Sequence, residues 1–281
     1  MRQVSTPPAP ASARVAALFD RVADTYESVG VPWFEPIAAH LVELMAAQPG
    51  EQAVDLGCGR GAALIPLAQA VGPGGRVTGV DLSPRMVELA AARARELGLD
   101  TVQVQVMDAA AVSLPAGQAD LVVASLVLFF LPEPLDALRG WVGLLRPAGR
   151  LGISTFGDRD PLWHQLDAVF QPYLPPQLLD ARTSGQAGPF SSDAGVEELF
   201  TQAGLVDVRT VHTVAEVAFA GADAWRTWSA SHGQRVMWDH VPEAERAAVL
   251  GRAAQVLAEG AGADGVTRLH QQVRYTLGRA G

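Results

Sequence analysis

Between residues 52 and 155 the chain alternates short apolar runs with longer amphipathic segments, and this alternation constrains its fold most strongly. The apolar runs have the length of strands that are buried on both faces, and the segments between them have the period of helices. Strands that alternate with helices predict an α/β fold with a doubly wound parallel sheet and helices on both faces. Ligands bind such sheets beyond the carboxyl ends of the strands.

The same patterns extend over the whole chain. The expected strands are 52–56, 76–81, 102–107, 121–127, 150–155, 206–219 and 266–278. The expected helices are 12–29, 33–47, 61–71, 84–98, 134–145 and 193–203, with two more over 222–260. Ser83 and Pro84 form a good helix start, because the hydroxyl can cap the helix and proline suits its first position. Gly98 is a plausible residue for its end.

Three glycines at alternate positions, Gly57, Gly59 and Gly61, follow the first expected strand. Glycine accepts a positive φ and lets a ligand approach main-chain N–H groups, and the next helix adds the positive end of its dipole. Asp55 stands just before them. A loop built only for a pyrophosphate disfavours a carboxylate there, whereas ammonium and sulfonium charges favour it. The spacing, with Ala62, also satisfies the dehydrogenase fingerprint, so a nicotinamide oxidoreductase is an alternative.

Asp55, Asp81 and Asp108 end three successive apolar strands. Asp81 lies 24 residues after Gly57, near the spacing at which a carboxylate accepts the two hydroxyls of a ribose. Asp108 can accept from the amine of adenine, and Asp55 can orient the amino-acid end of the ligand. Each acid alone is also compatible with a cap at a strand end. Together they predict a site for S-adenosylmethionine (SAM).

Residues 50–156 resemble the class I SAM-dependent methyltransferases, especially the small-molecule branch that includes enzymes of ubiquinone and menaquinone biosynthesis. The matching motifs are Val54–Gly61, Gly79–Ser83, Met107–Ala109, Asp120–Ser125 and Leu145–Leu151. The resemblance implies a Rossmann-like seven-stranded sheet whose last strand is antiparallel, with helical lid insertions after the fifth and sixth strands. The segment Phe19–Tyr26 resembles the helix that closes over the cofactor in this branch.

This comparison divides the chain into parts. The expected parts are a tail with cofactor-covering helices (1–49), the SAM-binding core (50–157), a lid insertion (158–192), and the rest of the core (193–281) with a second helical insertion at about 222–262. The residues expected to bind SAM, or its product S-adenosylhomocysteine (SAH), are Tyr26, Asp55, Gly57, Cys58, Gly59, Asp81, Leu82, Met86, Asp108, Ala109 and Ser125. Tyr26 is equally compatible with a core position.

Related sequences often carry a histidine after the fourth strand, where this chain has Val127-Leu128-Phe129-Phe130. We therefore expect an apolar wall there and no proton transfer by a histidine. The candidates for a general base are His164, His232 and His240, with Glu216 behind them. Trp225, Trp228 and His232 follow helical spacing, which fits either core packing or a pocket wall with a base. The residues expected to bind substrate are Phe129, Trp163, Tyr173 and Trp228.

The sequence therefore predicts an enzyme that methylates an apolar, ring-bearing small molecule, such as a secondary metabolite or a quinone-like phenol. O-methylation is favoured slightly over C- and N-methylation. The alternative is a cyclase or isomerase that keeps the scaffold and holds SAM as a structural ligand. The oxidoreductase is disfavoured, because all 21 basic residues are arginines and the Tyr-Lys dehydrogenase pair is missing.

Composition limits the partners and the environment. A net charge of −9 argues against nucleic-acid substrates. The single cysteine, Cys58, excludes an internal disulfide, and the six histidines lack metal-binding spacing, so no metal is expected. There is no run of roughly 18 apolar residues and no secretion signal, so we expect no membrane span and a cytoplasmic protein. Pro7–Pro10 suggests a loose tail, and a homodimer is among the expected states.

Overall fold

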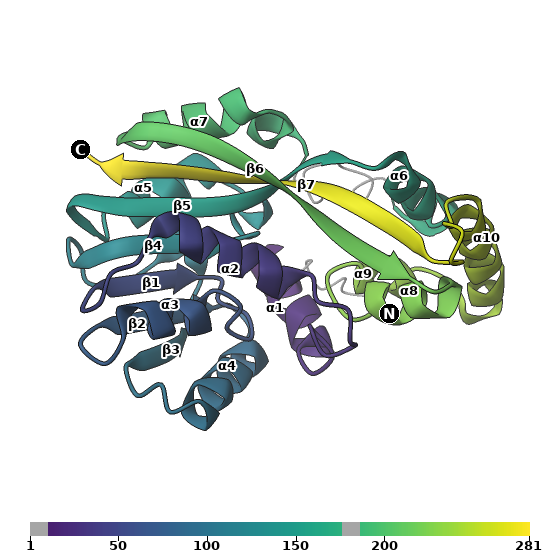
Figure 1. The fold of residues 1–281 in the computed structure, drawn as a ribbon, viewed down its shortest axis with the longest axis horizontal. Helices are drawn as coiled ribbons and strands as arrows, with labels where there is room; N and C mark the ends of the chain where they lie inside the picture. The colour runs from purple at the N-terminus through teal and green to yellow at the C-terminus, as the bar shows by residue number, and fades with distance from the viewer. Residues whose placement is uncertain (1–10, 176–185) are drawn as a thin grey trace, which may run out of the picture.

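A computed structural model describes residues 11–175 and 186–281, so the expected tail at Pro7–Pro10 lies outside the described residues (Figure 1). Seven strands form one sheet in the order β3-β2-β1-β4-β5-β7-β6. Strands β1 to β5 are parallel, and β7 is antiparallel to both β5 and β6. The strands are β1 (Gln52–Leu56), β2 (Arg76–Asp81), β3 (Val102–Val106), β4 (Ala119–Ser125), β5 (Leu145–Arg159), β6 (Leu205–Phe219) and β7 (Thr267–Ala280). The predicted seven-stranded sheet with an antiparallel last strand is confirmed.

Helices cover both faces of this sheet, as the alternating pattern predicts. In Figure 1 α2 and α3 lie in front of the sheet, and α5 and α7 lie behind it. The helices of the core are α1 (Ala11–Val22), α2 (Phe34–Met45), α3 (Leu64–Val71), α4 (Pro84–Glu96), α5 (Pro134–Val142) and α7 (Asp193–Gln202). The short 3-10 turns are η1 (Ala109–Ala111), η2 (Leu128–Phe130), η3 (Gln171–Tyr173), η6 (Gly188–Ser191) and η7 (Glu243–Glu245).

The remaining helices lie at the far end of the long strands. Strands β6 and β7 pair from Leu205 to Phe219, well beyond the central part of the sheet. This extension carries α6 (Pro161–Ala168), α8 (Ala222–Ser229), α9 (Arg235–Asp239) and α10 (Arg246–Glu259), which gather at one end of the molecule (Figure 1). We call these four helices the cap. They follow β5 and β6 in the chain, which are the positions at which the resemblance implies insertions.

Several predicted elements differ from the structure. The helix expected over 12–29 ends at Val22 as α1, and the chain then turns. The strand expected over 150–155 begins at Leu145 as β5, and it contains an irregularity at Ala148, where φ is 61° and the register with β4 shifts. The region 222–260 holds three α-helices rather than two. Helix α8 ends at Ser229, so Trp225, Trp228 and His232 do not share one helical face. His232 instead lies in the loop before α9, because the chain turns after Ser229.

Local signals predicted other boundaries correctly. The Ser83 hydroxyl accepts the N–H of Met86 at 3.1 Å, and Pro84 occupies the first turn of α4. Gly98 follows this helix with a φ of 66°, a conformation that glycine adopts without strain. Every residue of β4 from Ala119 to Ala124 is buried, as expected of a strand covered on both faces. In the described parts of the chain, no helix has the length and apolar character that crossing a membrane requires.

Candidate active site

A cavity of about 200 Å³ lies at the carboxyl ends of β1 and β4. The core contributes Asp55, Ser125 and the loop after β1 to its lining. The N-terminal segment contributes Tyr26, Glu27, Phe34 and Glu35 from the other side. The cavity therefore lies where ligands bind in doubly wound sheets, and residues 26–35 form one of its walls.

The loop after β1 is shaped by its glycines and by β2. Gly57, Gly59 and Gly61 have φ values of 71°, 51° and 98°, which other residues adopt only with strain. A Cβ atom on Gly57 would lie 2.5 Å from a methyl carbon of Val127. The backbone N–H groups of Gly57 and Cys58 both donate to the carbonyl of Val80, at 2.8 and 2.9 Å. These contacts fix a tight turn beside the cavity.

Asp55 is the most unusual group in the cavity. It is 1% exposed, and its Oδ2 atom has no hydrogen-bond partner among the described residues. Desolvation, with a smaller contribution from the charge of Asp81, raises the pKa of Asp55 to about 8. A buried carboxyl with an unused oxygen is suited to a cationic ligand, which restores its ionised form.

Asp81 holds the glycine loop in place. Its Oδ2 atom accepts the N–H of Gly59 at 2.8 Å, and its Oδ1 atom accepts the N–H of Ser83 at 2.9 Å. Desolvation raises its pKa, although these two N–H groups act in the opposite direction. Each carboxylate oxygen has a second lone pair, so the group can still accept ribose hydroxyls. Asp108 follows β3 and caps η1 by accepting the N–H of Ala110 at 2.8 Å.

The other residues expected to bind cofactor divide into two groups. Cys58 and Ser125 line the cavity together with Asp55. Cys58 is buried, and desolvation with the nearby carboxylates raises the pKa of its thiol. The hydroxyl of Ser125 lies 2.9 Å from that of Ser154 on β5. The other expected residues do not line the cavity in the described part of the chain. They are Asp81, Leu82, Met86, Asp108 and Ala109.

The N-terminal wall of the cavity is fastened to the core. Tyr26 is stacked on Phe34 with ring centroids 4.6 Å apart, and burial, with Glu27 and Asp81, raises its pKa. The guanidinium of Arg60, within the glycine loop, donates to the carbonyl of Tyr26. The Glu27 carboxylate accepts the N–H groups of Trp33, at 3.1 Å, and Phe34.

Sequence reasoning identified Tyr26 but missed Glu27, Phe34 and Arg60, although all three line the cavity. The signal for Glu27 was its position beside Tyr26, and the signal for Arg60 was its place between two glycines of the loop. Glu35 and Arg93 were also missed; they line the cavity and form an ion pair with each other.

The three candidate bases lie in different surroundings. His232 is 7% exposed and packs against Trp228 and Phe34, with ring centroids 4.4 and 5.5 Å away. His164 is exposed and lines a second cavity of about 310 Å³. His240 is exposed, and its Nδ1 atom lies 2.7 Å from the carbonyl of Val236. Only His232 contacts a residue that lines the first cavity.

The aromatic residues expected to bind substrate lie in different parts of the structure. Trp163 and Trp228 are buried and form a cluster with Trp33, in which the ring centroids are 5.7 to 5.9 Å apart. Phe129 lies in a second cluster with Phe130, with ring centroids 4.7 Å apart, and the apolar wall expected after β4 stays a prediction.

Tyr173 belongs to neither aromatic cluster. Its hydroxyl donates to Glu245 at 3.2 Å and accepts from the guanidinium of Arg252. These contacts place Tyr173 against α10 and η7.

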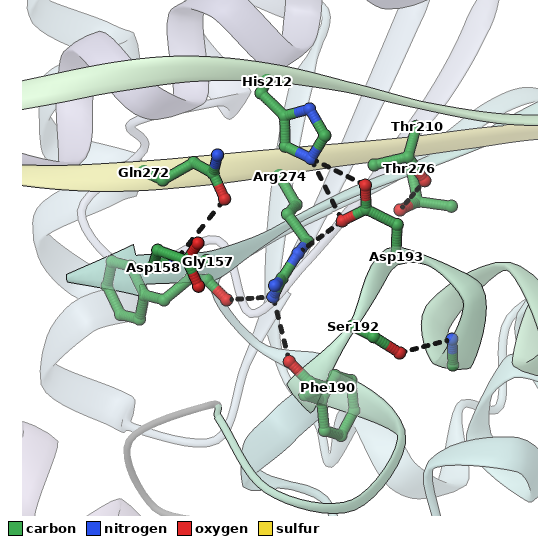
Figure 2. A network of polar contacts seen from close by, with 12 residues as sticks. Gly157, Asp158, Phe190, Ser192, Asp193, Thr210, His212, Gln272, Arg274 and Thr276 are labelled. Carbon is green, nitrogen blue, oxygen red and sulfur yellow. Dashed lines mark hydrogen bonds and ion pairs between the residues drawn. The ribbon is translucent and has the colours of Figure 1, made fainter.

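Figure 2 shows a polar network at the second cavity, centred on Arg274 of β7. This side chain is buried, and its Nε atom donates to Asp193 at 2.7 Å. One terminal nitrogen donates to the carbonyls of Phe156 and Phe190 at 2.7 and 2.9 Å. Desolvation acts to raise the pKa of Asp193, but hydrogen bonds from His212 and Arg274 outweigh it and lower the pKa. The network ties η6 and α7 to the sheet.

Within residues 11–175 and 186–281, no group of three or more histidine, cysteine or acidic side chains could hold a metal ion. The cavity instead offers a desolvated carboxylate and a glycine turn, and Asp81, which ends β2, holds that turn through the N–H of Gly59. These are groups that suit a cationic amino acid joined to a nucleoside.

Comparison with known proteins gives the family. Residues 54–153 match the family model of the methyltransferase domain. Nocamycin O-methyltransferase from Saccharothrix syringae is 36% identical over 272 residues, which cover 93% of this chain and 97% of that protein. The chain belongs to the SAM-dependent methyltransferases.

Two further similarities concern the sequence and the fold. Aklanonic acid methyltransferase from a Streptomyces strain is 37% identical over 59% of this chain and 76% of its own length. The solved structure of the [4+2]-cyclase SpnF shares the fold, with a TM-score of 0.57 and 22% identity over 98% of this chain and 97% of the other. The methyltransferase therefore uses SAM, and the cavity beside Asp55 has the chemical character that this cofactor requires.

Proposed function

We propose that this methyltransferase transfers the methyl group of SAM to an oxygen atom of an apolar, ring-bearing secondary metabolite. The observation that carries the proposal is the likeness to nocamycin O-methyltransferase over nearly the full length of both chains. The likeness to aklanonic acid methyltransferase supports the same class of acceptor. The two clusters of aromatic side chains around the cavity and the cap support an apolar acceptor.

The cofactor would be held by groups already described. When bound, SAM supplies a methyl group made electrophilic by the sulfonium charge. Asp55 would face its positive charges with the unpartnered Oδ2 atom, and the glycine loop would allow the ligand to approach the backbone closely. Asp81 would accept hydroxyls of the ribose, and Asp108 would accept from adenine. Arg60 and Glu27 would hold the N-terminal wall closed over the site.

The acceptor would lie between the cavity and the cap. The cluster of Trp33, Trp163 and Trp228 joins α6 and α8 to the N-terminal wall. Phe129 and Phe130, which follow β4, would form the opposite apolar wall. In this arrangement the cap and the wall exclude water and place the acceptor in line with the methyl group, and positioning of this kind accelerates reactions strongly. The described parts of 158–192, together with 222–262, would then act as the lid; residues 176–185 of this expected lid lie outside the described residues.

The experiment that tests the proposal uses SAM with an isotopically labelled methyl group and aklanonic acid as acceptor. A product that carries one labelled methyl group on oxygen, located by NMR, is the expected result. A product of unchanged mass and altered retention would support the alternative, a cyclase or isomerase. The [4+2]-cyclase SpnF has the same fold. A label on carbon or nitrogen would contradict O-methylation.

Three expectations about the protein's surroundings stay predictions. These are a homodimer, no binding to nucleic acid and a cytoplasmic location. Analytical ultracentrifugation and a DNA-binding titration test the first two, and the net charge of −9 supports the second.

A further inference from the structure

The second cavity, of about 310 Å³, lies outside the site proposed for SAM. Its lining includes Arg159 at the end of β5, His164 of α6, Phe190 of η6 and Arg274 of β7. None of these four residues lines the cavity beside Asp55. Two of them are arginines, in a chain whose net charge is −9. The cavity therefore has a chemistry of its own, which the binding of SAM does not use.

Arg274 has two N–H donors that the described structure does not use. A guanidinium has five N–H donors in a rigid plane. The Nε atom donates to Asp193, and Nη1 donates to the carbonyls of Phe156 and Phe190 (Figure 2). These bonds engage three donors, and the two on Nη2 have no partner among the described residues. Because the side chain is only 5% exposed, its contacts hold the unused edge of the guanidinium in a fixed position.

Arg159 brings a second guanidinium to the same cavity. Its Nη1 atom donates to Asp167 at 2.9 Å, and the group lies 5.5 Å from the centre of the Trp163 ring. Its Nε and Nη2 atoms have no hydrogen bond within the part of the chain that the structure describes. The register of β5 with β7 shifts between Phe156 and Arg159, and irregularities of this kind redirect side chains at binding sites.

The unused groups of this lining suit an anion. The carboxylates of Asp193 and Asp167 each pair with one guanidinium, but neither residue lines the cavity in the described structure. Asp158 is the acid among the described lining residues, and solvent screens its charge because the residue is exposed. Guanidinium N–H groups form strong, charge-assisted hydrogen bonds with the oxygens of anions. The cavity therefore offers buried donors to an oxyanion.

We propose that the second cavity binds an oxyanion group, such as a carboxylate, of a small molecule through Nη2 of Arg274 and the guanidinium of Arg159. The proposal goes beyond methyl transfer and does not depend on it. Phe190 gives the cavity an apolar wall, and its ring centroid lies 6.3 Å from that of Phe129. The anionic group has two possible sources with the same chemistry. One is a part of the acceptor remote from the methylated oxygen, and the other is a separate small molecule.

Benzoate is the probe, and benzamide, which has nearly the same shape without the charge, is the matched control ligand. Each is titrated calorimetrically into protein loaded with SAH, so that the cofactor does not compete. We expect benzoate to bind about tenfold to a hundredfold more tightly than benzamide, the range for hydrogen bonds to a charged group. Equal affinities, or no binding of benzoate, would overturn the proposal.

Two variants test whether benzoate binds at the arginines. Arg274→Lys keeps a positive charge but removes Nη2. Arg159→Gln removes the second guanidinium, while Gln234 still donates to Asp167 at 3.0 Å. We expect each to weaken benzoate binding by about tenfold. Arg268→Met, which changes an exposed arginine of β7, is the control and should bind as the unchanged protein does.

Thermal melts of each variant come first. If Arg274→Lys does not fold, Arg159→Gln carries the test, because its partner Asp167 keeps a donor. Unchanged benzoate affinity in a folded variant of either arginine would overturn the proposal.

A competition titration with aklanonic acid distinguishes the two sources. Displacement of benzoate would support a cavity that holds a group of the acceptor, and binding of both together would support a separate small molecule. A crystal structure with benzoate then locates the site. We expect its carboxylate within hydrogen-bond distance of Arg274 Nη2. Benzoate bound only elsewhere would overturn the proposal even if O-methylation is observed, so its failure is distinct from a failure of the proposed function.

Discussion

The carboxylate of Asp81 accepts the backbone N–H of Gly59 at 2.8 Å, so the acid that ends β2 holds the middle glycine of the loop after β1. The same carboxylate accepts the N–H of Ser83, at the start of α4. One side chain therefore connects the first two strand ends at the cavity. Its hold on the loop, and the contact with the ribose that we propose for it, both predict that cofactor binding depends on Asp81.

Replacement of Asp81 by alanine should weaken SAH binding by about tenfold or more, because hydrogen bonds to a charged group contribute about 1.5–3 kcal/mol. Isothermal titration calorimetry measures the change. Asp100→Ala, in the exposed turn after α4, is the control and should bind as the unchanged protein does. An affinity within about twofold for Asp81→Ala would show that the assignment is wrong.

Asp55 should make both stability and cofactor binding depend on pH. Its pKa rises from 3.8 to about 8 on folding, so the folded chain binds more protons than the unfolded chain in this window. The free energy of unfolding in the absence of cofactor should therefore fall as pH rises from about 4 to 8. Binding of a cation favours the ionised form, so SAM affinity should rise with pH over the upper part of that window.

Asp55→Asn removes this titration and serves as the test. Its Tm at pH 8 should exceed that of the unchanged protein, while its affinity for SAM should be lower and nearly independent of pH. Thermal melts and calorimetry across pH 5 to 9 measure both. A Tm difference that does not change with pH would contradict the burial of an ionisable carboxyl at Asp55.

The turn at Gly57 should not tolerate a side chain. Alanine there would meet Val127 at 2.5 Å in a backbone conformation with a φ of 71°. Gly57→Ala should therefore lower both the Tm and the affinity for SAH. Gly140→Ala in α5, where a Cβ meets nothing within 4 Å, is the matched control and should be neutral or slightly stabilising. Equal behaviour of the two variants would mean that the loop can relax.

Arg274 should contribute to stability through the network in Figure 2. Arg274→Met removes one donor from Asp193, which keeps His212, and the guanidinium donor from two carbonyls. Breaking a buried pair of this kind typically costs about 3–5 kcal/mol. Asp193 is partly exposed, so we expect the lower end of that range in urea unfolding. Arg268→Met, on the same strand as Arg274, removes an exposed ion pair with Asp264 and should change stability little.

The sheet and the glycine loop were predictable because their signals are local. A buried strand, a capping serine before proline and glycines at alternate positions are each recognised from residues only a few positions apart in the sequence. The ends of β1 and β2 then follow from topology, since parallel strands place Asp55 and Asp81 at one edge of the sheet. The irregularity at Ala148 was missed because proline and glycine suggest a turn, whereas pairing with β4 continues the strand.

The rest of the candidate site depends on contacts between distant segments. Phe34 and His232 come from the two ends of the chain, and only the packing of α8 and α9 against the N-terminal wall brings them together. Arg274 stands among polar residues that alternate with apolar ones along β7, but its burial results from the cover of η6 and α7. No periodic pattern in the sequence carries that information.

The central claim is that the desolvated carboxylate of Asp55 and the loop held by Asp81 bind the cationic amino-acid nucleoside. A crystal structure of the complex with SAH tests it most directly. The account predicts the amino-acid end of SAH beside Asp55 Oδ2 and the ribose hydroxyls at Asp81. Binding of SAH elsewhere on the protein, or in this cavity without contact to either carboxylate, would contradict it.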